Sequence, residues 1–329
     1  MQSLKSLKNR ITGIKSTNKI TSTMYLAASS MLVSARRKYA DVERYFTAFD
    51  HLTDHFLHSH PKQLLNAISN NITHRSTTNH THTTNNATQH DVWIVINSNK
   101  GLCGSFHAHI NAFCEKHILL QQHRNNTIST THNHTQQHDK PIVILIGDKS
   151  NALFGKEEVK HLIKLYQINS DNLTAKILNH SYASKITEQI SAILEPFQIK
   201  QIRAVYNKFI STNKCTVTAA DVFPIQASDT HNHGNNKNHP LFNYNKSLHS
   251  SIEYVAKKYF ATKLHMMLLN SLMSEYGARM IAMDNAKRNS RDLLDDLNII
   301  YNKTRQSNIT KELIEIGAGI QTLHNNDDI

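Results

Sequence analysis

The hydrophobic positions of the first 60 residues recur at alternating spacings of three and four, the pattern of a helix in a coiled coil. This stretch contains no proline and a single glycine, Gly13. These positions form one stripe along the helix, hereafter the N-terminal seam, which is polar only at Asn18 and Thr21. Proline interrupts a helix, so Pro61 is the expected end of this one. The members of the seam are Leu4, Leu7, Ile11, Ile14, Asn18, Thr21, Tyr25, Ala28, Leu32, Ala35, Tyr39, Val42, Phe46 and Phe49. We therefore predict one helix over residues 1–60, far longer than the globular average of about 11–12 residues.

A second seam follows Pro240, after which the sequence has no further proline. It passes through Ile252, Val255, Tyr259, Thr262, Met266, Leu269, Met273, Tyr276, Met280 and Met283, and continues more weakly through Lys287, Ser290, Leu294, Leu297 and Tyr301. Gly317 and Gly319 predict a fraying end. Because a helix of this length is not stable by propensity alone, it must pack on something. The simplest packing partner is the N-terminal helix of the same chain, which gives a long antiparallel two-helix coiled coil. The alternative is that the two helices belong to separate dimerising coiled coils.

Between the two helices, short apolar runs alternate with helical stretches. The predicted strands are 91–98, 141–148, 161–168, 201–209 and 215–225, and the predicted helices are 105–121 and 181–195. This alternation indicates an open α/β sheet of parallel strands, with the last strand a candidate antiparallel edge. The chain is thus expected to consist of an N-terminal helix (1–60), a central α/β domain (61–240) and a C-terminal helix (241–329).

Three polar tracts interrupt the central domain, at 74–90, 123–138 and 229–239. They are rich in Asn, Thr and His and almost free of apolar residues, so we expect disordered surface insertions. Each contains two histidines separated by one residue, namely His80 and His82, His132 and His134, and His231 and His233. Such pairs can ligate a divalent metal, but flexible tracts lack the outer-shell contacts that fix a metal site. We therefore expect loops and no metal site.

The formal net charge of +12 at pH 7 points to an acidic partner: nucleic acid, an anionic membrane surface or an acidic protein. The plain alternative is a soluble basic protein. The basic residues are spread along both helices and no recognition module is present, which disfavours a nucleic-acid-binding coiled coil. Only three cysteines occur, without CxxC spacing, so a reducing compartment is expected. No signal peptide or apolar membrane span is recognisable, which favours an intracellular protein, soluble or peripherally attached.

The segment "NSNKGLCGSF" (97–106) is the strongest candidate for chemistry, because glycines separate a strand from a helix. It matches neither the phosphate-loop pattern nor the dinucleotide-binding pattern. Gly101 and Gly104 therefore predict a tight structural turn. Cys103 is close in sequence to His107, but a Cys/His nucleophile needs an orienting group and a pocket. We interpret Cys103 as structural and expect no catalytic residue and no cofactor; a small-molecule enzyme built on the α/β domain is the rival interpretation.

Read together, the two ends resemble the gamma subunit of rotary F-type ATP synthases. The segment "IKSTNKITSTMYLAASSMLVSARR" (14–37) is similar to the family's first helix, and "SEYGARMIAMDNAKRNSRDLLDDLNIIYNKTRQSNITKELIEI" (274–316) is similar to its last helix. The segment "NKGLCGSF" (99–106) matches the glycine–cysteine turn after the first strand of the central domain, and "YNKF" (206–209) matches a later strand. The resemblance covers most of the chain outside the three tracts.

The resemblance implies a shaft made of the terminal helices, with a Rossmann-like α/β domain at its foot. It implies that the upper shaft turns inside a ring of three alpha and three beta subunits, with one gamma subunit per complex. The foot would bind the membrane ring of c subunits and a small epsilon-type subunit. The protein would transmit torque between proton flow and ATP synthesis, with no active site, no nucleic acid and no membrane span of its own.

The resemblance also implies contact residues. Arg305, Gln306 and Thr310 match the family's residues that hold a loop of the beta subunit, and Met24 matches a methionine that faces them from the first helix. Arg36, Arg37 and Lys38 retain part of a basic collar that is thinner here, because "AASSMLVSARR" has Ser, Leu and Val where the family has more basic residues.

Two departures bear on location. The sequence lacks the extra cysteine pair of plant chloroplast members, and its seam begins at Leu4, leaving no room for a transit peptide. Both favour a peripheral protein at the cytoplasmic face of a bacterial inner membrane. The alternative is a processed chain on the matrix side of the mitochondrial inner membrane.

Overall fold

The computed structural model describes residues 3–59, 89–119, 140–168, 170, 173–224 and 248–327. Its principal elements are, in order, α1 (Leu4–Ser59), β1 (Gln89–Ile96), α3 (Phe106–Cys114), β2 (Ile142–Ile146), β3 (Lys164–Ile168), α7 (His180–Leu194), β4 (Gln198–Ser211), β5 (Lys214–Phe223) and α8 (Leu248–Asp327). Short helical turns are a π-helical turn (Glu115–Leu119), a 3-10 turn (Asp148–Ser150), α5 (Asn151–Phe154) and α6 (Glu157–Lys160). Two compact units result: a terminal unit (residues 1–28 with 280–329) and a central unit (29–279).

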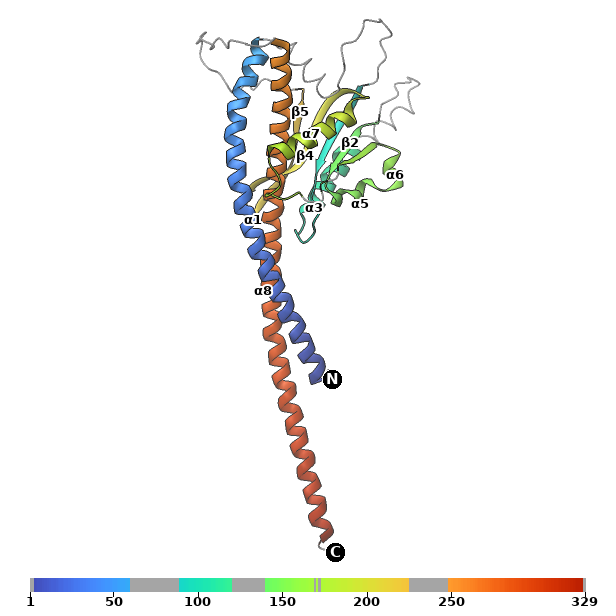
Figure 1. Ribbon diagram of the computed structural model, residues 1–329. Coiled ribbons are helices and arrows are strands. Elements are labelled where there is room, and N and C mark those ends of the chain that lie inside the picture. Colours follow the sequence, from blue (N-terminus) through green and yellow to red (C-terminus); the bar gives the residue numbers. More distant parts are fainter. Residues whose placement is uncertain are drawn as a thin grey trace. The chain divides into compact units, whose positions relative to one another are not determined.

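The central unit is built on one five-stranded sheet with the order β3-β2-β1-β4-β5. The first four strands in this order are parallel, and β5 is antiparallel to β4. The predicted α/β sheet and its antiparallel edge are therefore confirmed. Figure 1 shows β4 and β5 as a long hairpin beside the shorter strands. One bound needs correction: Gln89 and His90, the end of the first predicted tract, are the first residues of β1.

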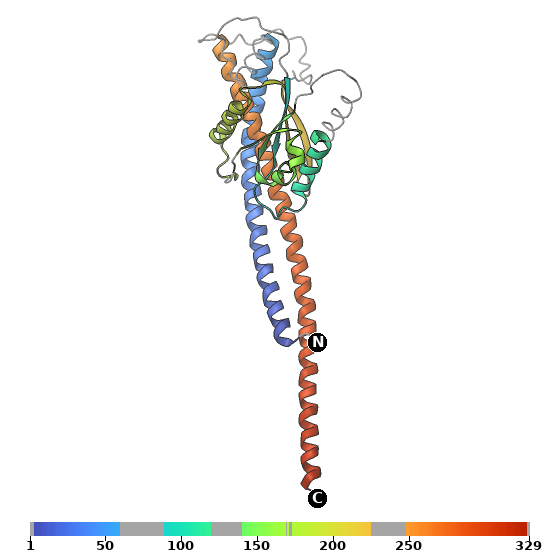
Figure 2. The same cartoon turned by 90° about the vertical axis from the view of Figure 1, so that its right-hand side faces the viewer.

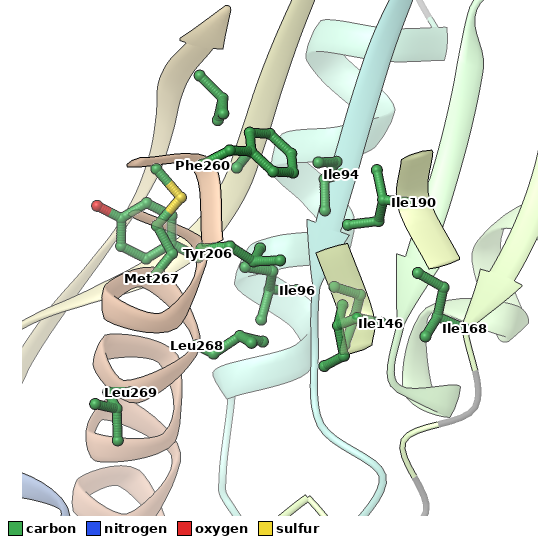
Figure 3. Close-up of a cluster of buried hydrophobic side chains, with 14 of the residues drawn as sticks. Ile94, Ile96, Ile146, Ile168, Ile190, Tyr206, Phe260, Met267, Leu268 and Leu269 are labelled. Atoms are coloured by element: carbon green, nitrogen blue, oxygen red, sulfur yellow. The ribbon is translucent and has the colours of Figure 1, made fainter. Parts of the chain in front are cut away.

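Successive residues of the inner strands point to opposite faces of the sheet, and both faces are buried. Ile94 and Ile96 of β1 enter a core that includes residues of α1, α7 and α8, whereas Trp93 and Val95 enter a second core that includes α3. This explains why the strands read as continuous apolar runs rather than alternating ones. Figure 2 shows α7 and α3 on opposite sides of the sheet, and Figure 3 shows the first core around Ile94, Ile146, Tyr206 and Leu268.

Polar contacts fix the position of α8 within the central unit. The Asn270 side-chain oxygen accepts a hydrogen bond from the Phe209 backbone N–H at 2.7 Å, and the Ser274 hydroxyl donates to the Asn207 carbonyl at 2.9 Å. At the start of α7, the Asn179 side chain accepts from the Tyr182 backbone N–H at 2.8 Å. It thereby satisfies one of the orphan donors of the first turn, as an N-cap residue does.

In the terminal unit, α1 and α8 pair in antiparallel fashion, as predicted. Leu7 and Ile11 are buried with Leu297, whereas Asn18 reaches further back along α8. Its side-chain amide donates to the Lys287 carbonyl at 3.0 Å and to the Ser290 hydroxyl at 2.9 Å. Asn18 interrupts the first predicted seam, and Lys287 and Ser290 interrupt the second. These polar positions thus lie together and form one hydrogen-bonded layer.

The helix end expected at Gly317 and Gly319 is wrong, because α8 continues through both to Asp327. A Cβ at either position would meet no heavy atom within 4 Å, so the glycines mark neither a turn nor a close contact. The tracts 74–88, 123–138 and 229–239, with their histidine pairs, lie outside the described residues. None of the described helices combines the length and the apolar character needed to cross a bilayer.

Candidate functional site

The last part of α8 is a single helix without a partner among the described residues. Buried positions end at Leu297, and Tyr301 is half-buried. From residue 302 to 319, hereafter the tip segment, every residue except the half-buried Thr304 is exposed. Figure 1 shows this part of α8 continuing past the N-terminus of α1. Its apolar side chains are 43–65% exposed: Ile309, Leu313, Ile314 and Ile316. An isolated helix is marginal in water, so the tip segment requires another surface to lie against.

The tip segment carries three of the predicted contact residues. Arg305, Gln306 and Thr310 are all exposed. Gln306 and Thr310 are four residues apart and share a face of the helix, and the Thr310 hydroxyl donates to the Gln306 carbonyl at 2.9 Å. Within the described chain, Arg305 has no carboxylate at ion-pair distance. Its guanidinium is therefore available to a partner.

Met24 does not face these three residues. It is half-buried on α1, next to Tyr25, whose ring lies 5.9 Å from the Lys287 ammonium of α8. The 18 residues from Lys287 to Arg305 span about 27 Å of helix. The expectation that Met24 lies opposite Arg305 is therefore wrong, because antiparallel pairing places residues near 24 opposite residues near 287.

The three residues of the predicted basic collar have different surroundings. Arg36 is exposed, and its guanidinium lies 5.9 Å from the centre of the Phe209 ring. Arg37 is exposed as well. The Lys38 ammonium donates to the backbone carbonyls of Lys176 at 3.1 Å and Leu178 at 3.3 Å. Lys38 thus holds a loop of its own chain, and the outward positive charge comes from the two arginines.

The predicted turn after β1 has left-handed backbone at Leu102 (φ 62°) and Gly104 (φ 57°). A Cβ at Gly101 would meet nothing within 4 Å, so only Gly104 is needed for its conformation. The turn is held from α8: Arg279 donates through Nε and Nη2 to the Gly101 carbonyl at 3.3 and 3.1 Å.

A buried carboxylate, Glu275, pairs with Arg279; we call this pair and its hydrogen bonds to the turn the clamp. Glu275 accepts from Arg279 at 2.6 Å, and both residues are less than 9% exposed. Burial raises the pKa of the Glu275 carboxyl, and the neighbouring guanidinium opposes that shift. Sequence reasoning missed this pair. The available signal was an acid and a base four residues apart inside a stretch that is otherwise apolar or small.

The structure places an orienting group, the Asn97 side chain, beside Cys103 and His107. The thiol lies 3.0 Å from His107 Nε2, and Nδ1 of the ring lies 2.8 Å from the Asn97 side-chain oxygen. Cys103 is, however, only 1% exposed. Burial raises the pKa of its thiol to about 11 and lowers the pKa of His107. At neutral pH, therefore, a thiol donates to a neutral imidazole, and the reactive thiolate is absent.

At the carboxyl edge of the parallel strands, where open α/β sheets bind ligands, polar groups of the chain bond to one another. Asn97 donates to the Ser150 hydroxyl at 2.8 Å. Asn99 accepts from the Asp148 backbone N–H at 2.9 Å, and Gln167 donates to the Asp148 carboxylate at 2.6 Å. No group of three or more potential metal ligands occurs in the described ranges.

Comparison with known proteins decides the family. A family model described as ATP synthase matches residues 3–323. The relatives named ATP synthase gamma chain include one from Amoebophilus asiaticus, 30% identical over 328 residues and covering 98% of this chain and 99% of the relative. Another, from Clostridium pasteurianum, is 28% identical over 317 residues and covers 96% and 97%. This chain belongs to the ATP synthase gamma chains.

A gamma chain is a component of the ATP synthase complex, and the matched range includes the tip segment, the turn after β1, all of α1 and α8 as far as residue 323. Among solved structures, a chain in the cryo-EM structure of Euglena gracilis mitochondrial ATP synthase is similar to this gamma chain. The similarity covers 99% of this chain and 96% of that chain, with a TM-score of 0.58 and 14% identity. At that identity the likeness concerns the fold alone.

Proposed function

We propose that the chain is the central rotor shaft of a proton-translocating F-type ATP synthase. It transmits torque between a membrane ring of c subunits and a hexamer of alpha and beta subunits, so that ion flow drives ATP synthesis. The observation that carries this proposal is the tip segment, a single exposed helix on a chain that belongs to the gamma family. Such a helix is explained if the inside of another protein's ring surrounds it.

The polarity of the tip segment suits rotation. A large, dry interface would trap the shaft in one orientation. Solvent-accessible ion pairs are worth only about 0–1 kcal/mol each, so contacts made by Arg305, Gln306 and Thr310 with a loop of the beta subunit can be exchanged as the shaft turns. Arg36 and Arg37 supply a second, basic contact region, and Met24 contributes a separate contact at the level of residues near 287.

Coupling rather than chemistry gives the mechanism. One asymmetric shaft meets three catalytic sites, and each orientation favours a different conformation at each site, so rotation changes nucleotide affinities in sequence. The chain contributes no catalytic group of its own. The thiol state of Cys103 and the internal hydrogen bonds at the carboxyl edge of the sheet both support this part of the proposal.

The proposed assembly has one gamma chain for three alpha and three beta subunits, with an epsilon-type subunit and the c ring at the foot. The proposed location is peripheral, at the cytoplasmic face of a bacterial inner membrane, or at the matrix side of the mitochondrial inner membrane.

Co-expression with alpha and beta subunits of the same source tests the function. We expect the chain to co-elute at one copy per three alpha–beta pairs, and ATP hydrolysis to fall when Arg305→Ala and Gln306→Ala are combined. The matched control is Glu157→Ala with Lys160→Ala, which removes an exposed ion pair of the central unit. A chain that elutes alone, with hydrolysis independent of it, would contradict the shaft function.

A further inference from the structure

Four basic side chains from three elements gather within the central unit. Lys38 comes from α1, His180 is the first residue of α7, and Lys258 and His265 come from α8. The Lys258 ammonium lies 3.1 Å from His180 Nε2, and the His180 and His265 rings are 6.4 Å apart. Burial lowers the pKa of both imidazoles, so at neutral pH the positive charge of this cluster lies on Lys38 and Lys258.

These basic groups are not balanced by acids. Within the described chain, no carboxylate lies at ion-pair distance from Lys38 or Lys258. His265 is 4% exposed, and its Nε2 has no hydrogen-bond partner. The two ammonium charges, which no carboxylate of the described chain compensates, favour a partner of opposite charge.

A cavity of about 280 Å³ opens beside this cluster, between α7 and α8. Its lining combines hydroxyl, aromatic and charged groups: Ser184, Thr187, Glu188, Tyr254, Lys257 and Lys258. The Lys257–Glu188 pair is long, at 3.7 Å, and both side chains are more than half exposed, so a partner can displace it at small cost. Tyr254 is 62% exposed, and the centre of its ring lies 5.7 Å from the Lys258 ammonium. Tyrosine is enriched at protein interfaces, so an exposed Tyr254 beside Lys258 favours a contact with a partner at this surface.

We propose that this α7–α8 surface, defined by His180, Tyr254, Lys257 and Lys258, binds an acidic segment of a partner polypeptide. A carboxylate of that segment pairs with Lys258, and a neighbouring side chain of the segment occupies the cavity against Tyr254. Glu188 in the lining disfavours a compact polyanion such as phosphate. Nucleic acid would need a longer series of cations along its backbone. The proposal goes beyond the shaft function, since it concerns a surface of the central unit and not the tip segment.

Zero-length crosslinking tests the proposal in the complex purified with the full set of co-expressed ATP synthase subunits. A carbodiimide joins a lysine to a carboxylate only when the two are in contact. We expect mass spectrometry to find an amide between Lys257 or Lys258 and an Asp or Glu of another polypeptide. Lys160 and Glu157, 2.6 Å apart, provide an internal link that reports whether the reaction worked.

Variants give the decisive comparison. In Lys257→Gln with Lys258→Gln we expect the link to disappear and the salt concentration that releases the partner to fall, with retention about tenfold weaker. Lys156→Gln with Lys160→Gln, which removes two lysines elsewhere in the central unit, should leave partner retention unchanged. Links from Lys257 and Lys258 only to Glu188, or a nuclease-sensitive product, would overturn the proposal.

The same sample separates this proposal from the shaft function. Co-elution with alpha and beta subunits but no link from either lysine would refute the acidic partner and leave the shaft intact. A link from either lysine to an acidic residue of another polypeptide, without co-elution with alpha and beta subunits, would support the acidic partner and refute the shaft function.

Discussion

Replacing Glu275 by alanine should destabilise the central unit strongly, because it leaves the Arg279 charge buried and unpaired. The Glu275 and Arg279 side chains are 8% and 10% exposed and 2.6 Å apart. Removing one partner of a buried ion pair costs about 3–5 kcal/mol. Arg279 keeps its hydrogen bonds to the Gly101 carbonyl, so the lower end, about 3 kcal/mol, is expected. Against a typical total of about 5–15 kcal/mol, this is a large fraction.

The assay is chemical denaturation of the full chain followed by tryptophan fluorescence. The sequence contains one tryptophan, and Trp93 is buried in the core of the central unit, so the signal reports unfolding of that unit. Glu157→Ala, which removes the exposed partner of Lys160, is the control and should leave the free energy of unfolding nearly unchanged, because solvent screens an exposed ion pair.

A second variant separates charge from packing. Glu275→Met combined with Arg279→Met removes both charges and should recover most of the lost stability, because apolar residues often replace a buried ion pair without loss. If Glu275→Ala alone changed the free energy of unfolding by less than about 1 kcal/mol, the assignment of a buried, uncompensated charge would be refuted.

Three further predictions concern pH, backbone and register. Burial, with nearby His180 and Lys38, lowers the pKa of His265 to about 4; the unfolded state then binds more protons below about pH 6.5, and stability falls as pH falls through this range. At pH 5 the free energy of unfolding is expected to be about 2 kcal/mol lower than at neutral pH. If denaturation curves of His265→Leu kept the same pH dependence, His265 would not be its cause. Gly147→Ala should destabilise the central unit, because φ is +101° and the new Cβ would lie 2.4 Å from the Asn97 carbonyl oxygen; an unchanged denaturation midpoint would contradict this. A polar residue in a coiled-coil seam fixes the helix register at a cost in stability. Asn18→Leu should therefore raise the thermal midpoint of the terminal unit, measured by circular dichroism. It should also allow more than one helix register, detected as multiple disulfide products between engineered cysteine pairs.

The sequence was most informative where a period repeats. Every member of the N-terminal seam is buried or half-buried, because a heptad pattern sustained over many turns admits one buried stripe. The strands were predictable from apolar runs bounded by turn residues, and the antiparallel edge followed from the short connection between the last two strands.

The remaining features depend on distances that no local pattern contains. The expected position of Met24 failed because the register of two distant helices sets which residues lie opposite, and the sequence does not state that register. Lys38 was expected to face a partner but contacts carbonyls that precede α7. The clamp on the turn joins residues 178 apart in sequence. Such contacts arise only when the sheet and α8 have packed together.

The pairing of the chain's two ends has a consequence for biosynthesis. Asn18 bonds to Lys287, which is 269 residues later. At synthesis rates of about 5–20 residues per second, the N-terminal half of this pair waits on the order of tens of seconds for its partner. During that interval its apolar seam is exposed, and contacts of such high sequence separation form slowly. The terminal unit therefore completes its fold after translation of most of the chain, and until then the nascent α1 is a substrate for any chaperone that binds amphipathic helices.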